Sequence, residues 1–182
     1  DNTDLRGADL RGARLDGAVL HAVRMNGADL AGASLAGTHL GADHRRDAAD
    51  LHGCNLRNAN LSHADLRRVR LCQSELQQAQ FERADLQGAD LSQSDLSGAQ
   101  LCNALLIEAD LRRSKLQGTD LRDAHLNGAN LVDADLREAD LTSRHSGGFA
   151  VINRARLHGA RLQGAKLAGV WASHTDFSDA DL

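Results

Sequence analysis

Residues 84–103 read ADLQG ADLSQ SDLSG AQLCN, four consecutive units of five residues with a leucine at the centre of each. With few substitutions, leucine keeps this spacing from Leu5 to Leu40, from Leu51 to Leu141, and again from Leu157. A period of five fits neither an amphipathic helix, whose apolar residues recur at three and four, nor a strand, whose apolar residues alternate. A short repeat sustained over the whole chain indicates a solenoid.

Each five-residue unit has a second regularity around its leucine. Two residues before the leucine lies a small residue such as Ala8, and the residue between them is mostly polar, such as Asp9. This alternation predicts a short extended step with the small residue and the leucine inside and the polar residue outside. The two residues after the leucine are polar or glycine, as in Gln87-Gly88, which is typical of a turn.

The pattern A(D/N)LXX, as in Ala8-Asp9-Leu10-Arg11-Gly12 and Ala59-Asn60-Leu61-Ser62-His63, resembles the pentapeptide-repeat family over almost the entire chain. The resemblance implies an all-β fold, the right-handed quadrilateral β-helix (pentapeptide-repeat solenoid) with four pentads per coil. Residues 1–182 would then form a single solenoid whose 36 units make about nine coils. At about 4.8 Å per coil, the rod would be roughly 43 Å long.

The composition excludes several classes of protein. The chain has no proline or tyrosine, one tryptophan and three phenylalanines, so an ordinary aromatic core cannot form, and the leucines must fill the interior. No apolar run approaches the roughly 20 residues of a membrane span. The net charge of -4 does not indicate direct nucleic-acid binding.

The pentad spacing breaks twice, within residues 41–48 (GADHRRDA) and residues 142–149 (TSRHSGGF). In one interpretation a pentad has swollen to six residues, Leu51 stacks over Leu30, and both breaks lie on one face. In the other, a six-residue loop separates consecutive faces, Leu51 stacks over Leu35 or its neighbour, and the breaks lie on different corners. Because loops on a rigid scaffold often carry function, the basic residues of the breaks are candidate partner-binding residues: His44, Arg45, Arg46, Arg144 and His145.

Apolar residues at outward-facing positions give three more candidate contacts with a partner. Leu105 and Ile107 flank the inward Leu106, and Trp171 precedes Ala172, which occupies a position where leucine belongs. A patch of exposed apolar residues indicates an interaction site, whereas scattered ones are normal. Incidental exposure and local repacking around Trp171 are the competing interpretations.

Acidic residues before the leucines form stacked outward columns. In the pentapeptide-repeat proteins that protect type II topoisomerases, the rod resembles a DNA duplex in shape and charge. The resemblance therefore implies an alternative function, a DNA mimic that binds DNA gyrase and inhibits or protects it. Against this function, the columns also contain Arg, Lys, Gln and Asn, and a basic collar follows at Arg156, Arg161 and Lys166. The candidate DNA-mimic acids are Asp90, Asp95, Asp110, Asp120, Asp135 and Asp140.

Catalysis is not expected, because a solenoid filled with side chains offers no pocket for convergent groups. The nine histidines show no metal-ligand spacing, so neither a metal nor another cofactor is predicted. Cys54 occupies an inward position, while Cys72 and Cys102 follow leucines and should face outward. The odd number of cysteines argues against a disulfide framework and favours a cytoplasmic location over that of a secreted effector.

The sequence thus predicts a non-enzymatic, rigid scaffold for protein–protein interaction, bacterial in origin, whose partner is another protein. Both ends of the sequence read as repeat units, and an uncovered solenoid end exposes its core and its unpaired backbone. We therefore expect the ends to be covered by an end-to-end homodimer or by a flanking domain.

Overall fold

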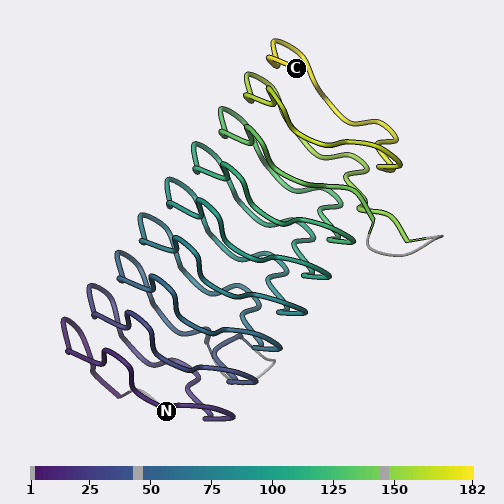
Figure 1. Ribbon diagram of the computed structural model, residues 1–182. Coiled ribbons are helices and arrows are strands. Elements are labelled where there is room, and N and C mark those ends of the chain that lie inside the picture. Colours follow the sequence, from purple (N-terminus) through teal and green to yellow (C-terminus); the bar gives the residue numbers. More distant parts are fainter. Residues whose placement is uncertain (1–2, 43–46, 144–147) are drawn as a thin grey trace.

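The structure, a computed structural model, describes residues 3–42, 47–143 and 148–182. It is a rod of stacked coils in which the chain rises steadily from one end to the other, with the two termini at opposite ends (Figure 1). In the described residues, the backbone pairing consists of single-residue parallel bridges between residues that lie 20 apart, such as Asp50 with Arg70, or 26 apart across the two breaks, such as Arg24 with Asp50. Four pentads therefore make one coil, and the expected all-β quadrilateral solenoid is confirmed.

The bridge residues stack into four outward-facing columns, which define four faces of the rod. Face 1 carries Asp4, Arg24, Asp50, Arg70, Asp90, Asp110, Asn130, Arg156 and Asp176. Face 2 carries Asp9, Asp29, Asn55, Glu75, Asp95, Lys115, Asp135, Arg161 and Asp181. Face 3 carries Arg14, Ser34, Asn60, Gln80, Gln100, Asp120, Asp140 and Lys166. Face 4 carries Val19, His39, Asp65, Asp85, Leu105, His125, Val151 and Trp171.

Hydrogen bonds between coils explain why the five-residue unit stacks. In each regular unit, the amide of the bridge residue bonds to the preceding coil, and the amides of the leucine and of the second residue after it bond to the next. The pentad at residues 49–53 shows this set: Asp50 N to Val23 O at 2.9 Å, Leu51 N to Arg70 O at 2.9 Å and Gly53 N to Cys72 O at 3.0 Å. The extended step is thus satisfied only when another coil lies beside it.

The bend uses the remaining two amides of the unit. Cys54 N donates to Leu51 O at 3.2 Å, which closes a four-residue turn. The third residue of such turns has a positive φ, which is 66° at Gly53 and 57° at Asn58. The amide of the residue after the leucine bonds to the bridge residue's side chain, as His52 N does to Asp50 Oδ1 at 3.1 Å. Aspartate or asparagine at the bridge position therefore completes the backbone pairing.

The interior is filled by the central residue of each pentad and by the small residue that precedes it. Every central leucine from Leu30 to Leu136 is at most 1% exposed, and Met25 and Phe81 fit the same column positions. Each buried leucine contributes about 1.5–3 kcal/mol. Inward serines stay paired, since Ser94 Oγ donates to Leu71 O at 2.7 Å.

The register across the two breaks decides between the two interpretations of the pentad spacing. Asp50 pairs with Arg24 and Val151 pairs with His125, so the partners lie 26 residues apart rather than 20. Six residues are therefore inserted between consecutive faces, and the swollen-pentad interpretation is wrong. The stacking partner of Leu51 is Met25, so the sequence-based alternatives for that partner, Leu30 and Leu35, are both wrong.

The insertions lie at different corners, as the loop interpretation predicts. The first separates face 4 from face 1, and the second separates face 3 from face 4. Glycines stand beside both. A Cβ on Gly41 would lie 2.8 Å from Arg67 N, and one on Gly148 would lie 2.5 Å from Ser143 Oγ. The regular part of the chain is 34 pentads, or eight and a half coils at four pentads each.

Candidate interaction surface on face 4

Leu105, Ile107 and Trp171 come together on one side of the rod. Leu105 and Trp171 belong to the same outward column of face 4, with His125 and Val151 as the two steps between them. Ile107 follows the inward leucine of the Leu105 pentad, at the corner between faces 4 and 1. The three sequence-predicted contacts are therefore parts of one surface.

The C-terminal end of this surface is an aromatic pair. The rings of Phe149 and Trp171 are stacked, with centroids 3.8 Å apart and an interplanar angle of 13°. Trp171 points outward, as the repeat pattern predicts, and is 54% exposed, one of three large hydrophobic residues of the described chain that are exposed. Ala172, which the pattern places inward, is exposed. An exposed, laterally held tryptophan is the type of side chain that contributes most to protein interfaces.

We call Leu105, Ile107, Phe149, Val151 and Trp171 the apolar ladder. Leu105 and Ile107 are half-buried, and Val151 is 7% exposed, so the ladder protrudes most at Trp171. Ile107 also lines two shallow hollows at its corner, one shared with Asn127 and Asn153 and the other with Arg67 and Gln87. The apolar ladder therefore protrudes at Trp171 and borders two hollows at Ile107.

Three members of this surface were missed by the sequence analysis, namely His125, Phe149 and Val151. Val151 has an apolar side chain at a bridge position, which was a readable signal. Its place above His125 depends on the 26-residue register, however, and the repeat period of 20 does not supply that register. The other candidates from the breaks, which are His44, Arg45, Arg46, Arg144 and His145, lie outside the described residues.

The six candidate DNA-mimic acids occupy three different faces. Asp90 and Asp110 lie on face 1, Asp95 and Asp135 on face 2, and Asp120 and Asp140 on face 3. Five of the six form ion pairs: Asp95 with Lys115 at 3.1 Å, Asp110 with Arg112 at 2.5 Å, Asp120 with Arg122 at 2.5 Å, Asp135 with Arg137 at 2.7 Å and Asp140 with Lys166 at 3.3 Å. The carboxylate of Asp90 accepts hydrogen bonds from the amide and hydroxyl of Ser92.

These contacts lower the pKa values of several carboxyl groups. The hydrogen bond from the Arg137 side chain lowers the pKa of Asp135 against the opposing effect of burial. At Asp110, partial burial alone would raise the pKa, but hydrogen bonds from Arg112 outweigh it and the pKa is lowered. The acids are therefore charged, yet much of that charge is neutralised by arginines two residues away.

Two residues of the basic collar, Arg161 and Lys166, also form ion pairs with the candidate acids. Arg161 lies 3.4 Å from Asp135, and Lys166 lies 3.3 Å from Asp140. Arg156 differs, because it forms no ion pair within residues 3–42, 47–143 and 148–182. The collar is thus continuous with the acidic columns on faces 2 and 3, and on face 1 Arg156 lies beside Asp176 in the column without forming an ion pair in the described residues.

Across the part of the chain that the structure describes, no group of three or more His, Cys, Asp or Glu residues could hold a metal ion. No disulfide joins the three cysteines, and Cys54 is buried as predicted. Cys102 is only 2% exposed although it lies outside the hydrophobic core cluster, because neighbouring side chains cover it, and Asn103 Nδ2 donates to its sulfur at 3.0 Å. In the described residues, no helix has the length and apolar character needed to cross a membrane.

Comparison with protein families agrees with the coil geometry. The model for pentapeptide repeats matches in eight copies, over residues 1–41, 49–88, 84–123, 104–142 and 149–182. The matched segments omit the centres of the two breaks. No curated protein matches the sequence significantly.

The solved structures that match this chain include three proteins with the following identities, coverages and TM-scores. HetL, a pentapeptide repeat protein involved in heterocyst differentiation regulation in the cyanobacterium Nostoc sp. PCC 7120, is 29% identical, with 100% of this chain and 87% of that chain covered and a TM-score of 0.37. QnrB1, a plasmid-mediated fluoroquinolone resistance protein, is 18% identical, with 93% of this chain and 92% of that chain covered and a TM-score of 0.49. A pentapeptide repeat protein from the thylakoid lumen of Arabidopsis thaliana is 28% identical, with 56% of this chain and 60% of that chain covered and a TM-score of 0.26.

Proposed function

The chain belongs to the pentapeptide-repeat family, whose members form right-handed quadrilateral β-helices, and on this premise we propose that it is a rigid, non-enzymatic scaffold that binds another protein through the apolar ladder. The observation that carries this proposal is the exposed Trp171, stacked on Phe149 at the C-terminal end of the face 4 column, which also holds Leu105 and Val151. A tryptophan at that bridge position supplies none of the carboxylate bonding that the repeat normally uses. We infer that this exposed side chain contacts the partner.

The scaffold supports binding because it fixes the ladder before the partner arrives. Val151 N donates to Ala124 O at 3.0 Å and Trp171 N to Ala150 O at 3.0 Å, so the backbone of each step is held by the coil before it. A surface whose backbone is already ordered loses little conformational entropy on association. The partner needs to present a complementary apolar side chain to the stacked rings.

Affinity capture with matched variants tests this function. The purified chain captures partners from its native lysate, and the captured proteins are compared for wild type, Leu105→Asp, Trp171→Ala and Val19→Asp. Val19 is the control because it occupies the same column at the other end of face 4 and is 55% exposed. We expect a partner that is lost in the Leu105 and Trp171 variants and retained in the Val19 variant. Identical captured sets in all four proteins would contradict the proposal.

A second candidate function is DNA mimicry directed at DNA gyrase. It is supported by the stacked carboxylates of Asp90 with Asp110 on face 1 and of Asp120 with Asp140 on face 3. It ranks second because five of the six candidate acids are ion-paired. A gyrase supercoiling assay separates the two functions, since a mimic inhibits or protects the enzyme at micromolar concentration and the scaffold has no effect there.

We also propose that the ends of the rod are covered by a second copy or by a flanking domain. Leucines of the first coil, Leu5, Leu10, Leu15 and Leu20, are partly buried, whereas those of the middle coils are fully buried. Analytical ultracentrifugation of this chain distinguishes the two covers. A concentration-dependent dimer supports a second copy, and a monomer at all concentrations excludes it.

A further inference from the structure

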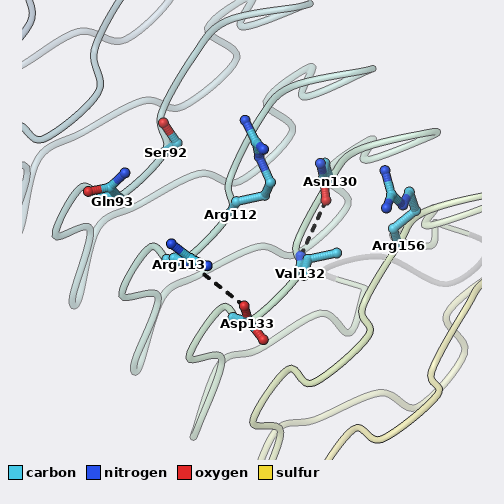
Figure 2. A pocket seen from close by; sticks show the side chains of 8 residues that line it. All are labelled: Ser92, Gln93, Arg112, Arg113, Asn130, Val132, Asp133 and Arg156. Atoms are coloured by element: carbon cyan, nitrogen blue, oxygen red, sulfur yellow. Dashed lines mark hydrogen bonds and ion pairs between the residues drawn. The ribbon is translucent and has the colours of Figure 1, made fainter.

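A hollow of about 330 Å³ lies at the corner between faces 1 and 2, away from the apolar ladder (Figure 2). Three arginines line it, namely Arg112, Arg113 and Arg156, together with Asn130 and Val132. Figure 2 shows the side chains of Arg112, Asn130 and Arg156 in a row, with Asn130 in the middle. These three residues belong to three successive coils, so the coil stacking itself sets their spacing.

The hollow lies where the outward column of face 1 changes its charge. The column runs from Asp90 and Asp110 through the neutral Asn130 to the cationic Arg156. An aspartate at position 130 would follow the repeat pattern and would place a carboxylate between the two arginines. Asparagine makes the same backbone contact without that charge, so the site stays open to an anion from outside.

The polar groups in the row still have hydrogens to donate. Asn130 Oδ1 accepts from Val132 N at 3.4 Å, which leaves the amide NH2 of Asn130 for a ligand. Asp110 engages Nε of Arg112 at 2.9 Å and Nη2 at 2.5 Å, so the Nη1 amino group keeps its hydrogens. Arg156 is exposed and, among the described residues, has no ion pair. Its nearest carboxylate in the column is that of Asp176, whose pKa is lowered by hydrogen bonds from Ser178 and also by the charge of Arg156.

The remaining lining residues define the type of ligand. Val132 is a half-buried apolar side chain within the hollow, at a turn position that is polar in most pentads. Arg113 is held by Asp133, with 3.6 Å between Nε and Oδ2, so it contributes less free charge than Arg156. The site therefore combines the guanidinium of Arg156 and the remaining Nη1 group of Arg112, whose charge is paired with Asp110, with an amide donor and an apolar surface. The carboxylate of Asp133, which is paired with Arg113, also lines the hollow.

We propose that this hollow binds a small organic oxyanion, a carboxylate or phosphate carried on an apolar body such as an aromatic ring. Guanidinium groups bind both anions through paired, charge-assisted hydrogen bonds, and Asn130 adds a third donor between them. The apolar body packs against Val132. This site is independent of the apolar ladder, which lies on another face, so either can fail without the other.

An NMR titration of the full chain tests the proposal with three probes: phenyl phosphate, benzoate and inorganic phosphate. The reporters are the side-chain amide of Asn130 and the backbone amide of Val132. Arg156→Ala removes one cation, and Asn130→Asp places a carboxylate in the row while keeping the side-chain oxygen that Val132 N needs. Arg70→Ala is the matched control, because Arg70 is an exposed cation at the equivalent position of the same column.

We expect saturable shifts at both reporters with phenyl phosphate or benzoate, and the tighter of the two identifies the anion. Arg156→Ala should weaken binding about tenfold, the loss of one hydrogen-bonded charge. Asn130→Asp should abolish binding in a folded protein, and Arg70→Ala should leave it unchanged. The proposal is overturned if no probe shifts the reporters at millimolar concentration, if Arg156→Ala binds like wild type, or if inorganic phosphate binds as tightly as phenyl phosphate.

Discussion

On face 2, the bridge residue Asp135 bonds to the amide of Arg137 at 3.3 Å and to its guanidinium group at 2.7 Å. On face 4, the bridge positions of the C-terminal half hold Leu105, His125, Val151 and Trp171, none of which carries a carboxylate. Both faces nevertheless have the same leucine interior and the same ladder of inter-coil bonds. The comparison shows that a carboxylate at a bridge position accepts hydrogen bonds within its own turn. It also shows that the coil forms without this carboxylate at Leu105, Val151 and Trp171.

The difference also changes how surface charge is interpreted. A column of aspartates suggests an anionic surface, but on faces 1 and 2 each acid that is followed by an arginine two residues later forms a local pair, as in Asp110 with Arg112. The carboxylates of these acids are therefore engaged by their own turns, which leaves less of their charge for a binding partner. The apolar bridge residues of face 4 have no such local task, and for that reason they are the clearer candidates for an interaction site.

The first prediction removes the interior that the two faces share. Leu106 lies inside face 4 and Leu116 inside face 2, and both are fully buried. Replacing either with alanine should lower the free energy of unfolding by about 2–5 kcal/mol, because each substitution leaves a cavity. Urea unfolding measures both. A loss in one variant with none in the other would show that the faces differ inside as well as outside.

The second prediction exchanges the two kinds of bridge residue. Asp135→Leu should lower the free energy of unfolding by about 1–2 kcal/mol, because the amide of Arg137 loses its charged acceptor in a partly buried site. Leu105→Asn should change it by no more than about 0.5 kcal/mol, because the new amide oxygen can accept from the backbone. Urea unfolding of the two variants checks the exchange, and equal losses would refute it.

The third prediction concerns acid pH. Hydrogen bonds from the side chains of Arg6 and Arg11 lower the pKa of Asp4 on face 1 and of Asp9 on face 2 from 3.8 to about 2. Between these values the unfolded chain binds more protons, so this stabilisation is present above pH 3.8 and is lost as the pH falls towards 2. The thermal unfolding midpoint, followed by circular dichroism, should therefore decrease over this range.

The control for the acid effect is Arg11→Gln, which removes the charged donor to Asp9. Its unfolding midpoint should fall less steeply between pH 4 and pH 2 than that of the wild type. A midpoint that is constant with pH in the wild type would contradict the pairing of these carboxylates.

The smallest predicted effect is on the aromatic pair. Phe149→Ala should change the free energy of unfolding by less than about 1 kcal/mol, since the stacked ring it removes lies beside an exposed one. It should increase the acrylamide quenching of Trp171, the single tryptophan of the chain. Val19→Ala, in the same column at the other end, is the control and should leave quenching unchanged. Unchanged quenching in the Phe149 variant would mean that the rings do not stack in solution.

The sequence was sufficient for the repeating parts of this protein. The leucine spacing and the small residue before each leucine define an extended step with a filled interior, and the family pattern supplied the four sides. Where the bridge residue is Asp or Asn, its side chain accepts a hydrogen bond from the amide two residues later, as Asp50 Oδ1 does from His52 N. A structure set by nearest neighbours in the chain can be derived from one unit and then repeated.

The candidate site could be predicted only in parts. Leu105, Ile107 and Trp171 were found as exceptions to the pattern, but as three separate ones. They share one surface because Val151 pairs with His125 across a six-residue insertion. The pentad spacing alone left the placement of that insertion ambiguous. The anion hollow has the same origin, because Asn130 and Arg156 also pair across that insertion.

The sequence by itself therefore determined the coil, its filled core and the polarity of each position. The tertiary structure decided the register across the two insertions, and with it which exceptional residues share a column and which acids are neutralised by neighbours. The physical reason is that hydrogen bonds within a pentad depend on residues two or three apart, whereas the alignment of coils depends on backbone pairing over 20 or 26 residues.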